Sequence, residues 1–462
     1  MSVHLPTAEM VELTKKTKII DDLLGGTATM RKAAQTYLFQ MEMEEPDSYR
    51  KRLERSTLYP ALSETLSQMT GRVFFNPIDV ADVTETVQAL FDDVDLVGNN
   101  LDVFASRWFY SALAYGCSFA LIDFARVEAV KSRAEEKALN ARPYWVHIKP
   151  HQVLGIKTAR VNGKQAITQF RYVVNEQVED GEFGVKTVKH VYVYEIGKVR
   201  KFSEAEGEFR FESELQLTAQ NRPLDFVPVV PFITKRNELT NAIEPPLMEL
   251  AYLNIKHWSS QSDQDNITNT ARVPLLAVFS NEEVNKLVIG GSAVHLPTGS
   301  SMQFVEHSGQ AIEAGMASLK DLEEQMKTAG AKLLTKTALA MTDSQARDEA
   351  GKEISQLRLL ANRFEDAIDL ALEYTGHWLG IVKEQVGNVQ ISGNIENDLD
   401  PAASMASVIQ LRNAGVISNQ STFDEAKRRG LLADGLEWDT EQERLQSEGM
   451  HFDLEETSET NT

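Results

Sequence analysis

The helix predicted after Pro245-Pro246 changes character half-way along, and this change limits what the chain can fold into. A proline pair suits the first turn of a helix, where the backbone N–H groups have no partner. The first turns then carry an apolar set: Leu247, Leu250, Ala251, Leu253, Ile255 and Trp258. From Ser259 to Asn266 no residue is apolar. A helix that is polar on every side bridges through solvent, packs on polar copies of itself or does not form.

A compact insertion follows this helix, and a second helix follows the insertion. The insertion begins with a β-like segment, Val273–Phe279, and closes with Met302–Val305. Between these segments lie its main apolar residues, Leu287, Val288, Ile289 and Val294–Leu296. The second helix is predicted from about Gln310 to Leu334. Its apolar residues recur three and four positions apart: Ile312, Met316, Leu319, Leu322 and Met326.

A third and longer helix is predicted beyond a polar break at Thr335–Ser344. It runs from about Gln345 to Val386, with Gly376 and Gly380 as candidate bends. Its apolar stripe is nearly unbroken: Ile354, Leu357, Ala361, Phe364, Ile368, Leu372 and Leu379. At 1.5 Å per residue this helix would reach roughly 60 Å. Rings and bundles need such a helix more often than compact monomers do.

The remaining segments indicate an α+β protein that is mainly helical. The first 140 residues have helical periodicity, with breaks at Gly25-Gly26 and Pro60 and a new helix from Asn100. Residues 143–237 alternate apolar and polar side chains as antiparallel strands do, and Asn162-Gly163 is a strong hairpin signal. A short strand, 389–391, follows the long helix. Two short helices, 401–415 and 422–430, and an acidic tail from Glu437 end the chain.

Charge restricts the way in which the chain can meet nucleic acid. It has 47 Lys and Arg against 68 Asp and Glu, a formal net charge of −21. Proteins that grip DNA tightly show a basic face, because neutralised phosphates release counterions. We therefore expect nucleic acid to be guided or repelled by this chain rather than held, although solubility alone would also explain the charge. No apolar run reaches the length of a membrane span.

Candidate chemical sites are few, and each has an ordinary structural explanation. The cluster Asp92, Asp93 and Asp95 lacks the alternating ligands and final glutamate of an EF-hand loop, so we expect a solvated turn. His147 and His151 are four residues apart but in strand context, without a third metal ligand. Cys117, the only cysteine, lies in an apolar run and is predicted to be a buried small hydrophobe. We expect no catalytic site, metal or cofactor.

The segment 411–429 is similar to a helix-turn-helix. Its only basic cluster is Lys427-Arg428-Arg429, and the acidic tail follows closely. A small helical packing unit is therefore favoured over DNA readout.

The order helical region, β-rich module, helix, insertion, helix, polar loop and long helix resembles that of tailed-bacteriophage portal proteins. Short stretches resemble a podovirus-type portal subfamily formerly catalogued as a domain of unknown function. These stretches are Tyr49–Arg55, Leu66–Phe75, Glu244–Asp263, Arg272–Ala277 and Thr335–Asp348, the last leading into Leu357–Leu379. The resemblance covers roughly residues 40–430.

The resemblance implies a ring-forming portal fold with wing, stem, clip and crown regions. The wing would comprise residues 1–240, together with a long helix and strand at 345–394. Residues 245–271 and 310–334 would be the stem helices, and 272–309 the clip between them. Residues 335–344 would form the tunnel loop, and 395–462 the crown and acidic tail.

The same resemblance implies which residues meet DNA and partner proteins. The stem and tunnel-loop residues expected at the DNA channel are Ser262, Asp263, Asn266, Lys327, Lys332, Thr335, Lys336 and Thr337. The clip residues expected at the docking surface are Leu287, Val288, Ile289, Val294 and His295. Exposed lysines are common on helices, so the lysines alone would not indicate a DNA contact.

The implied function is a portal ring, typically of twelve subunits, at one capsid vertex, through which DNA is packaged and ejected. Expected partners are further copies of the chain, the major capsid protein and scaffold, the terminase large subunit and the head-to-tail adaptor. Double-stranded DNA would pass without sequence specificity. The protein would be assembled in the host cytoplasm and reside in the virion. Alternatives are a minor head or scaffold protein, a hydrolase using scattered acids, and a helix-turn-helix regulator.

Overall fold

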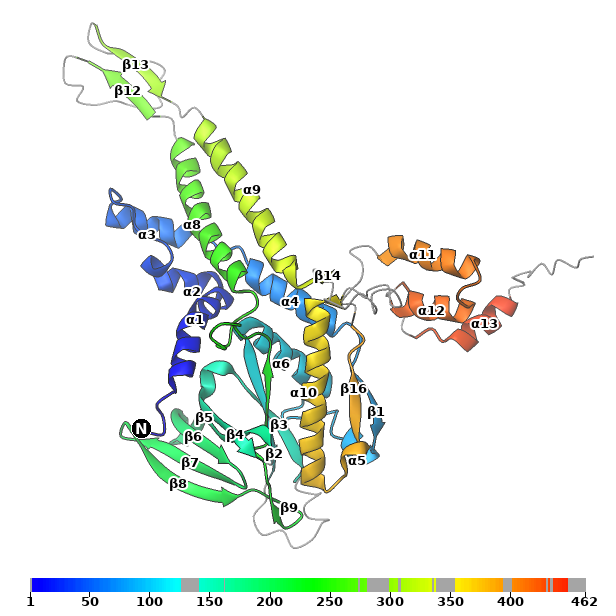
Figure 1. Ribbon diagram of the computed structural model, residues 1–462. Helices are drawn as coiled ribbons and strands as arrows, with labels where there is room; N and C mark the ends of the chain where they lie inside the picture. The colour runs from blue at the N-terminus through cyan, green and yellow to red at the C-terminus, as the bar shows by residue number, and fades with distance from the viewer. Residues whose placement is uncertain are drawn as a thin grey trace, which may run out of the picture. The chain divides into compact units, whose positions relative to one another are not determined.

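The computed structural model describes residues 2–125, 141–161, 163–272, 275–280, 299–305, 309–334, 336–337, 354–393, 401–428, 431–432 and 435–447. The chain divides into two units, Met1–Ser392 and Gly393–Thr462 (Figure 1). The first unit combines helices with antiparallel sheets and the second is helical, so the α+β class is confirmed. Among the described helices, none is both long and apolar enough to cross a membrane.

Helices occupy most of the first 115 residues, as predicted. Breaks fall at Gly25 and around Pro60, and the Asn100 side chain caps the last of these helices by accepting a hydrogen bond from the Val103 N–H at 2.9 Å. Thr7 precedes the first helix but makes no side-chain capping bond. The helices are α1 (Ala8–Leu24), α2 (Gly26–Ala33), α3 (Pro46–Arg55), α4 (Ala61–Val73), α5 (Glu85–Gln88) and α6 (Leu101–Tyr115).

A three-stranded antiparallel sheet forms the centre of the first unit. Its middle strand is β2 (Cys117–Phe124), flanked by β11 (Val229–Ile233) and β3 (Pro143–Ile148). Six successive residues of β2 are buried, because both faces of the strand are covered. The helices α6 and α10 (Gln356–Leu379) pack against this sheet.

Aromatic rings fill the space between α10 and the central sheet. The buried Phe364 ring of α10 lies 4.9 Å from Trp108, 5.2 Å from Phe109 and 4.7 Å from Phe232, between ring centroids. Two indoles bond across the same interface: Trp145 Nε1 donates to Thr375 Oγ1 at 2.9 Å, and Trp378 Nε1 donates to the carbonyl of Ile122 at 3.0 Å. This cluster is the main core of the unit.

The predicted β-rich module is a five-stranded antiparallel sheet with its strands in chain order. β4 and β5 form a hairpin that pairs up to Val161 and Lys164, as predicted. The strands are β4 (Val153–Val161), β5 (Lys164–Asp180), β6 (Gly184–Glu195), β7 (Lys198–Ala205) and β8 (Glu208–Gln216). A two-residue pair, β9 (Thr218–Ala219) and β10 (Arg222–Pro223), follows the module.

The predicted helix–insertion–helix segment is confirmed in its described parts. The two helices, α8 (Met248–Ala271) and α9 (Gln310–Ala331), pack against each other. At the end of α8 the chain enters β12 (Leu275–Phe279), which pairs antiparallel with β13 (Ser301–Val305) before α9 begins (Figure 1). A single 3₁₀ turn, Lys332–Leu334, extends α9.

The predicted long helix is wrong at both ends. A two-residue ladder, β14 (Lys336–Thr337) with β15 (Ile354–Ser355), immediately precedes α10, and the Ser355 side chain caps α10 by accepting from the Arg358 N–H. Gly380 ends the helix in the left-handed conformation, at φ 72°. The described helix has 24 residues, about 36 Å at 1.5 Å each. Val386 belongs to β16 (Val386–Gln390), which pairs with β1 (Asp79–Val83).

The second unit contains α11 (Pro401–Asn413), α12 (Asn419–Arg428) and α13 (Trp438–Ser447). The Phe423 and Trp438 rings, 5.4 Å apart, join α12 to α13. The predicted pair of short helices is therefore confirmed. The first part of the predicted acidic tail is a helix, and residues 448–462 lie outside the described residues.

Candidate functional site on the polar half of α8

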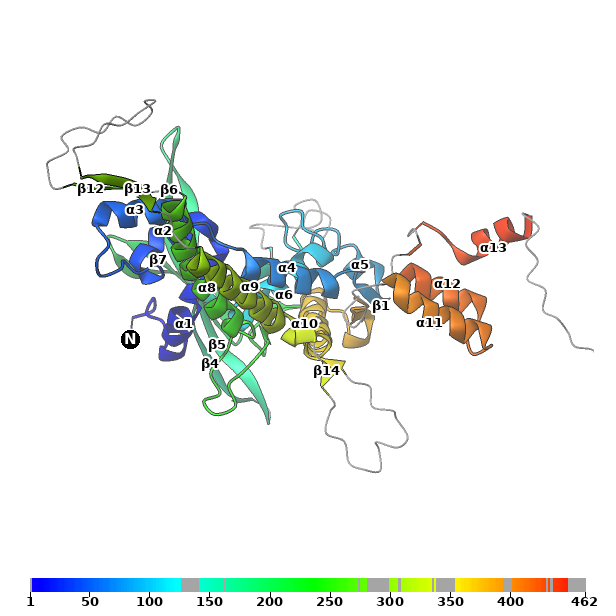
Figure 2. The same ribbon diagram turned by 90° about the horizontal axis from the view of Figure 1, so that it is seen from above.

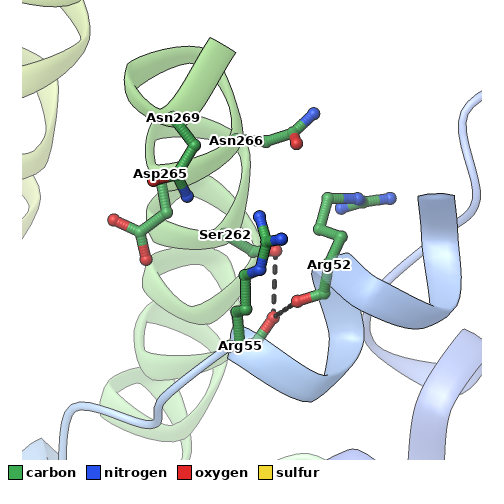
Figure 3. Close-up of a pocket in the computed structure, with 7 residues that line it drawn as sticks. Arg52, Arg55, Ser262, Asp265, Asn266 and Asn269 are labelled. Carbon is green, nitrogen blue, oxygen red and sulfur yellow. Dashed lines mark hydrogen bonds between the residues drawn. The ribbon is translucent and has the colours of Figure 1, made fainter. Parts of the chain in front are cut away.

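The polar half of α8 lies against α3 and is bonded to it, whereas its sequence predicted exposure to water or to other copies. Ser262 is only 2% exposed, and its hydroxyl lies 3.0 Å from that of Ser56, which itself bonds the Arg52 carbonyl (Figure 3). Ser259 donates to the carbonyl of Tyr37 at 2.7 Å. The helix therefore satisfies part of its polar face within the same chain.

Arg52 is the residue that organises this contact. Its guanidinium, 3% exposed, donates to both carboxylate oxygens of Glu44 at 2.7 Å, to the Phe39 carbonyl at 2.7 Å and to Asp263 at 3.1 Å. The hydrogen bonds from Arg52 lower the pKa of Glu44. Burial raises the pKa of Asp263, against the opposing effect of Arg52. The buried cation thus joins α3, the preceding loop and α8.

A small polar pocket opens beside this ion pair. Side chains of α3 and α8 line it: Arg52, Arg55, Ser56, Ser262, Asp265, Asn266 and Asn269. Figure 3 shows Arg55 rising from α3 toward Ser262, with Asn266 and Asn269 further along α8. Gln261 donates to Asp265 at 2.8 Å, so this carboxylate is also engaged. The pocket offers amides and charges to water or a polar partner, but no nucleophile with an activating base.

On its other side α8 meets α9. Gln264, 7% exposed, donates to the Ile312 carbonyl at 2.9 Å. About two turns before it, the buried His257 ring lies 5.1 Å from the Tyr59 ring at a tilt of 40°, and its Nε2 lies 3.7 Å from Glu323. Burial lowers the pKa of His257. The polar side chains of α8, which the sequence suggested all face solvent, are therefore divided among contacts with α3, contacts with α9 and exposure to solvent.

The predicted channel residues are separated by the structure. The predicted exposure of Ser262 is wrong, because α3 covers it, and Asp263 is half-buried in an ion pair with Arg52. Asn266 is exposed on α8.

Of the predicted lysines, Lys327 is exposed on α9 and bonded to Glu324 at 2.6 Å, and Lys332 is exposed in the 3₁₀ turn. The backbone of Lys336 and Thr337 forms β14, while Thr335 lies outside the described residues.

The predicted docking residues of the insertion lie outside the described residues. They are Leu287, Val288, Ile289, Val294 and His295. The described part of the insertion is the β12–β13 hairpin, whose Phe279 is 56% exposed and Met302 36%.

Sequence reasoning missed Arg52 and Ser56 as partners of α8. The available signal was the basic run Tyr49–Arg55. Within the helix, Arg52 has no acidic residue four positions before it that could form a stabilising ion pair. The buried partner of such an arginine must come from elsewhere in the fold, and sequence spacing does not reveal it.

The other candidate chemical residues are structural. Cys117 is fully buried, and burial raises the pKa of its thiol to about 12, so it is not a thiolate at neutral pH. His147 lies 2.8 Å from the Ser118 hydroxyl, and burial lowers its pKa to about 4. Asp93 pairs with Arg142, and Asp95 accepts backbone N–H groups of its own turn. Among the described residues no cluster of three His, Cys, Asp or Glu could hold a metal.

Comparisons with known proteins place a family model on the part of the chain from the start of α8 to the end of α10. Residues 246–379 match a family described as a domain of unknown function, DUF4055. No curated protein matches the chain.

Three of the solved chains that are similar to this one come from gene transfer agent (GTA) particles. A chain of the virion of a native gene transfer agent (GTA) particle shares 12% identity at a TM-score of 0.39 over 87% of this chain and 98% of that one. A chain from the neck of the empty GTA particle, computed with C6 symmetry, shares 13% at 0.39 over 81% and 90%. One from the neck of the native GTA particle, computed with C12 symmetry, shares 12% at 0.40 over 94% and 95%. At scores of this size the likeness assigns no function to this chain.

Proposed function

We propose that this chain is the portal subunit of a tailed bacteriophage, a structural ring protein without catalytic activity. The observation that carries the proposal is the continuous segment from α8 to α10. Two packed antiparallel helices, α8 and α9, are separated in the chain by the paired strands β12 and β13. After α9 the chain leaves at Thr337 and returns at Ile354, where the β14–β15 ladder pairs the two ends of this excursion, and α10 then enters the core. A stem, a clip, a tunnel loop and a wing helix would follow one another in this order.

Exposed apolar side chains on both stem helices support assembly. Tyr252 and Ile267 of α8 are 52% and 39% exposed, and Met316 of α9 is 51% exposed. Side chains of this size on two helices that extend from a core favour contact with neighbouring copies. Between them, exposed polar groups such as Asn266 and Lys320 would face water or polar groups of the next subunit.

The charge of the chain supports a channel through which DNA slides. Each copy carries a formal charge of −21, and a ring would multiply it around the axis. Acidic walls repel phosphates, so that DNA would not adhere during packaging or ejection. Lys332, exposed next to the β14–β15 ladder, would supply a local cation where the excursion begins. DNA would pass without recognition of its sequence.

The proposed ring would stand at one capsid vertex of the virion after assembly in the host cytoplasm. Its wing and crown would meet the major capsid protein and scaffold. Its clip would dock first the terminase large subunit and then the head-to-tail adaptor. Twelve subunits is the proposed number.

The deciding experiment is native mass spectrometry of the purified chain, with two-dimensional class averages in the electron microscope. We expect closed rings near twelve subunits with an open axial channel. Co-expression with scaffold protein provides a second chance for assembly. A chain that remains monomeric or dimeric in both preparations would overturn the proposal and favour a minor head protein.

A further inference from the structure

The five-stranded sheet has two hairpin ends of opposite charge, and they lie at the two ends of one strand. β5 has 17 residues and begins at the turn from β4 and ends at the turn into β6. At about 3.3 Å per residue its two ends are roughly 50 Å apart. In Figure 2 the β5–β6 hairpin ends near the label β6, and the β4–β5 hairpin extends past the label β4 on the opposite side.

The end formed by β4 and β5, which we call the basic end, comprises residues 157–164. It contains three exposed cations, Lys157, Arg160 and Lys164, and no acidic residue. None of the three has an ion pair among the described residues. The chain has a net charge of −21, so a hairpin with three unpaired cations differs from the rest of its surface. Such a hairpin would bind an acidic partner.

The end formed by β5 and β6, which we call the acidic end, comprises residues 176–185. It contains four exposed carboxylates: Glu176, Glu179, Asp180 and Glu182. Lys186, the next residue of β6, lies 3.6 Å from Asp180 and offsets one of these charges, so the end keeps an excess of negative charge. Phe183 in its turn is 91% exposed and Val185 is 64% exposed. β7 pairs with β6 only from His190 onward, so the acidic end is a free two-stranded ribbon that projects beyond the sheet.

A groove lies beside the basic end and could receive the aromatic ring of the acidic end. It has a volume of about 780 Å³, and its main apolar lining comes from α1, β4, the end of β11 and the segment after it: Met10, Leu13, Ile156, Ile233 and Ile243. Its charged lining is balanced, with Lys16 and Arg236 against Glu9 and Glu12. The groove thus supplies apolar contact, and the basic end supplies the charge.

We propose that the acidic end of one copy docks on the basic end and adjoining groove of a second copy, in a contact that repeats around the ring. The proposal rests on the ring-forming role proposed above. A contact between two different surfaces of the same chain is heterologous, and it closes into a ring when its rotation permits. Opposite charges at the two ends of β5 favour this head-to-tail pairing and oppose the pairing of two like ends.

Charge reversal tests the pairing directly. One variant reverses the acidic end: Glu179→Lys, Asp180→Lys and Glu182→Lys. A second reverses the basic end: Lys157→Glu, Arg160→Glu and Lys164→Glu. A third combines all six changes and keeps the net charge of the original chain. A matched control reverses three acids of the β7–β8 hairpin and β8: Glu206→Lys, Glu208→Lys and Glu214→Lys.

We expect each single-end variant to need at least about tenfold more protein for ring formation, because like charges placed together cost several kcal/mol. The six-fold variant should regain rings at the original concentration, and the control should assemble normally. Far-ultraviolet circular dichroism and thermal unfolding should be unchanged in all four variants, because the changed residues are exposed. Phe183→Ala should weaken assembly without a change of charge.

Rings of unchanged stability in both single-end variants would overturn this inference and leave the portal proposal intact. Loss of rings that the six-fold variant does not restore would show that the two ends are needed but do not meet, which also overturns it. If the control also failed to form rings, the change in net charge would explain the loss of rings in the single-end variants, and the inference would be overturned. An original chain that never assembles would overturn both proposals together.

Discussion

Arg52 of α3 and Asp263 of α8 are 211 residues apart in the sequence, and a hydrogen bond of 3.1 Å between Nη1 and Oδ1 joins them. The bond ties the first of the two proposed stem helices to the N-terminal helical region. Because Arg52 also holds Glu44 and the Phe39 carbonyl, one side chain determines how the loop before α3 and the polar half of α8 are positioned.

Replacing Arg52 by alanine should destabilise this junction strongly. The Glu44 side chain is only 8% exposed and would remain as a buried carboxylate without its cation, which costs about 3 kcal/mol or more. Hydrogen exchange of α3 and α8 should accelerate, and the urea midpoint should fall. Arg55→Ala is the matched control, since Arg55 is exposed, and it should change stability by about 0.5 kcal/mol or less. Equal effects of the two changes would contradict the role given to Arg52.

Two glycines with the same backbone conformation provide a second matched pair. Gly116 and Gly163 have φ of 87° and 82°, a left-handed region in which alanine costs about 1 kcal/mol. A Cβ at Gly116 would also lie 2.8 Å from the Glu244 carbonyl carbon, whereas a Cβ at Gly163 would meet nothing within 4 Å. Gly116→Ala should therefore lower the free energy of unfolding by at least about 1 kcal/mol more than Gly163→Ala. Chemical denaturation measures this difference. Equal losses of unfolding free energy in the two variants would mean that the backbone at Glu244 moves away from the added Cβ without a cost.

Periodicity predicted the local structure well where one face of an element is buried against a single neighbour. The helix start at Asn100, the hairpin between Val161 and Lys164 and the two strands around the insertion were confirmed. The long helix was predicted too long at both ends because Ile354 continues its apolar stripe, although it pairs in β15. Pairing with Thr337 depends on an excursion of the chain that periodicity does not detect.

The candidate site was less predictable than the fold, for a similar reason. A run of serine, glutamine and asparagine has the same appearance whether water or another helix covers it. Ser262 is buried because Ser56, more than 200 positions away, supplies a hydroxyl at 3.0 Å. Long-range polar partners of this kind are fixed by tertiary packing, so the sequence indicated which residues are polar but not which of them are buried.

The aromatic cluster around Phe364 should carry much of the stability of the first unit. Phe364→Ala would open a cavity among Trp108, Phe109 and Phe232 and should cost about 3–5 kcal/mol. Leu359→Ala, on the same helix but 39% exposed, should cost about 1 kcal/mol or less. Thermal unfolding followed by near-ultraviolet circular dichroism distinguishes them, because the indole of Trp108 reports on this core. Similar melting temperatures for both variants would contradict the placement of the core.

Acid should destabilise the first unit through His147. Burial lowers the pKa of this imidazole to about 4, from an ordinary value of about 6.5 in the unfolded chain. Between these values the unfolded chain binds a proton that the folded protein does not, so stability rises with pH and is lost as pH falls from about 6.5 toward 4. The full loss would be up to roughly 3 kcal/mol, since one pKa unit corresponds to about 1.4 kcal/mol. In His147→Gln, whose amide can still bond the Ser118 hydroxyl, urea midpoints measured from pH 7 to pH 4 should fall less steeply than in the original chain; identical slopes would show that His147 is not the titrating group.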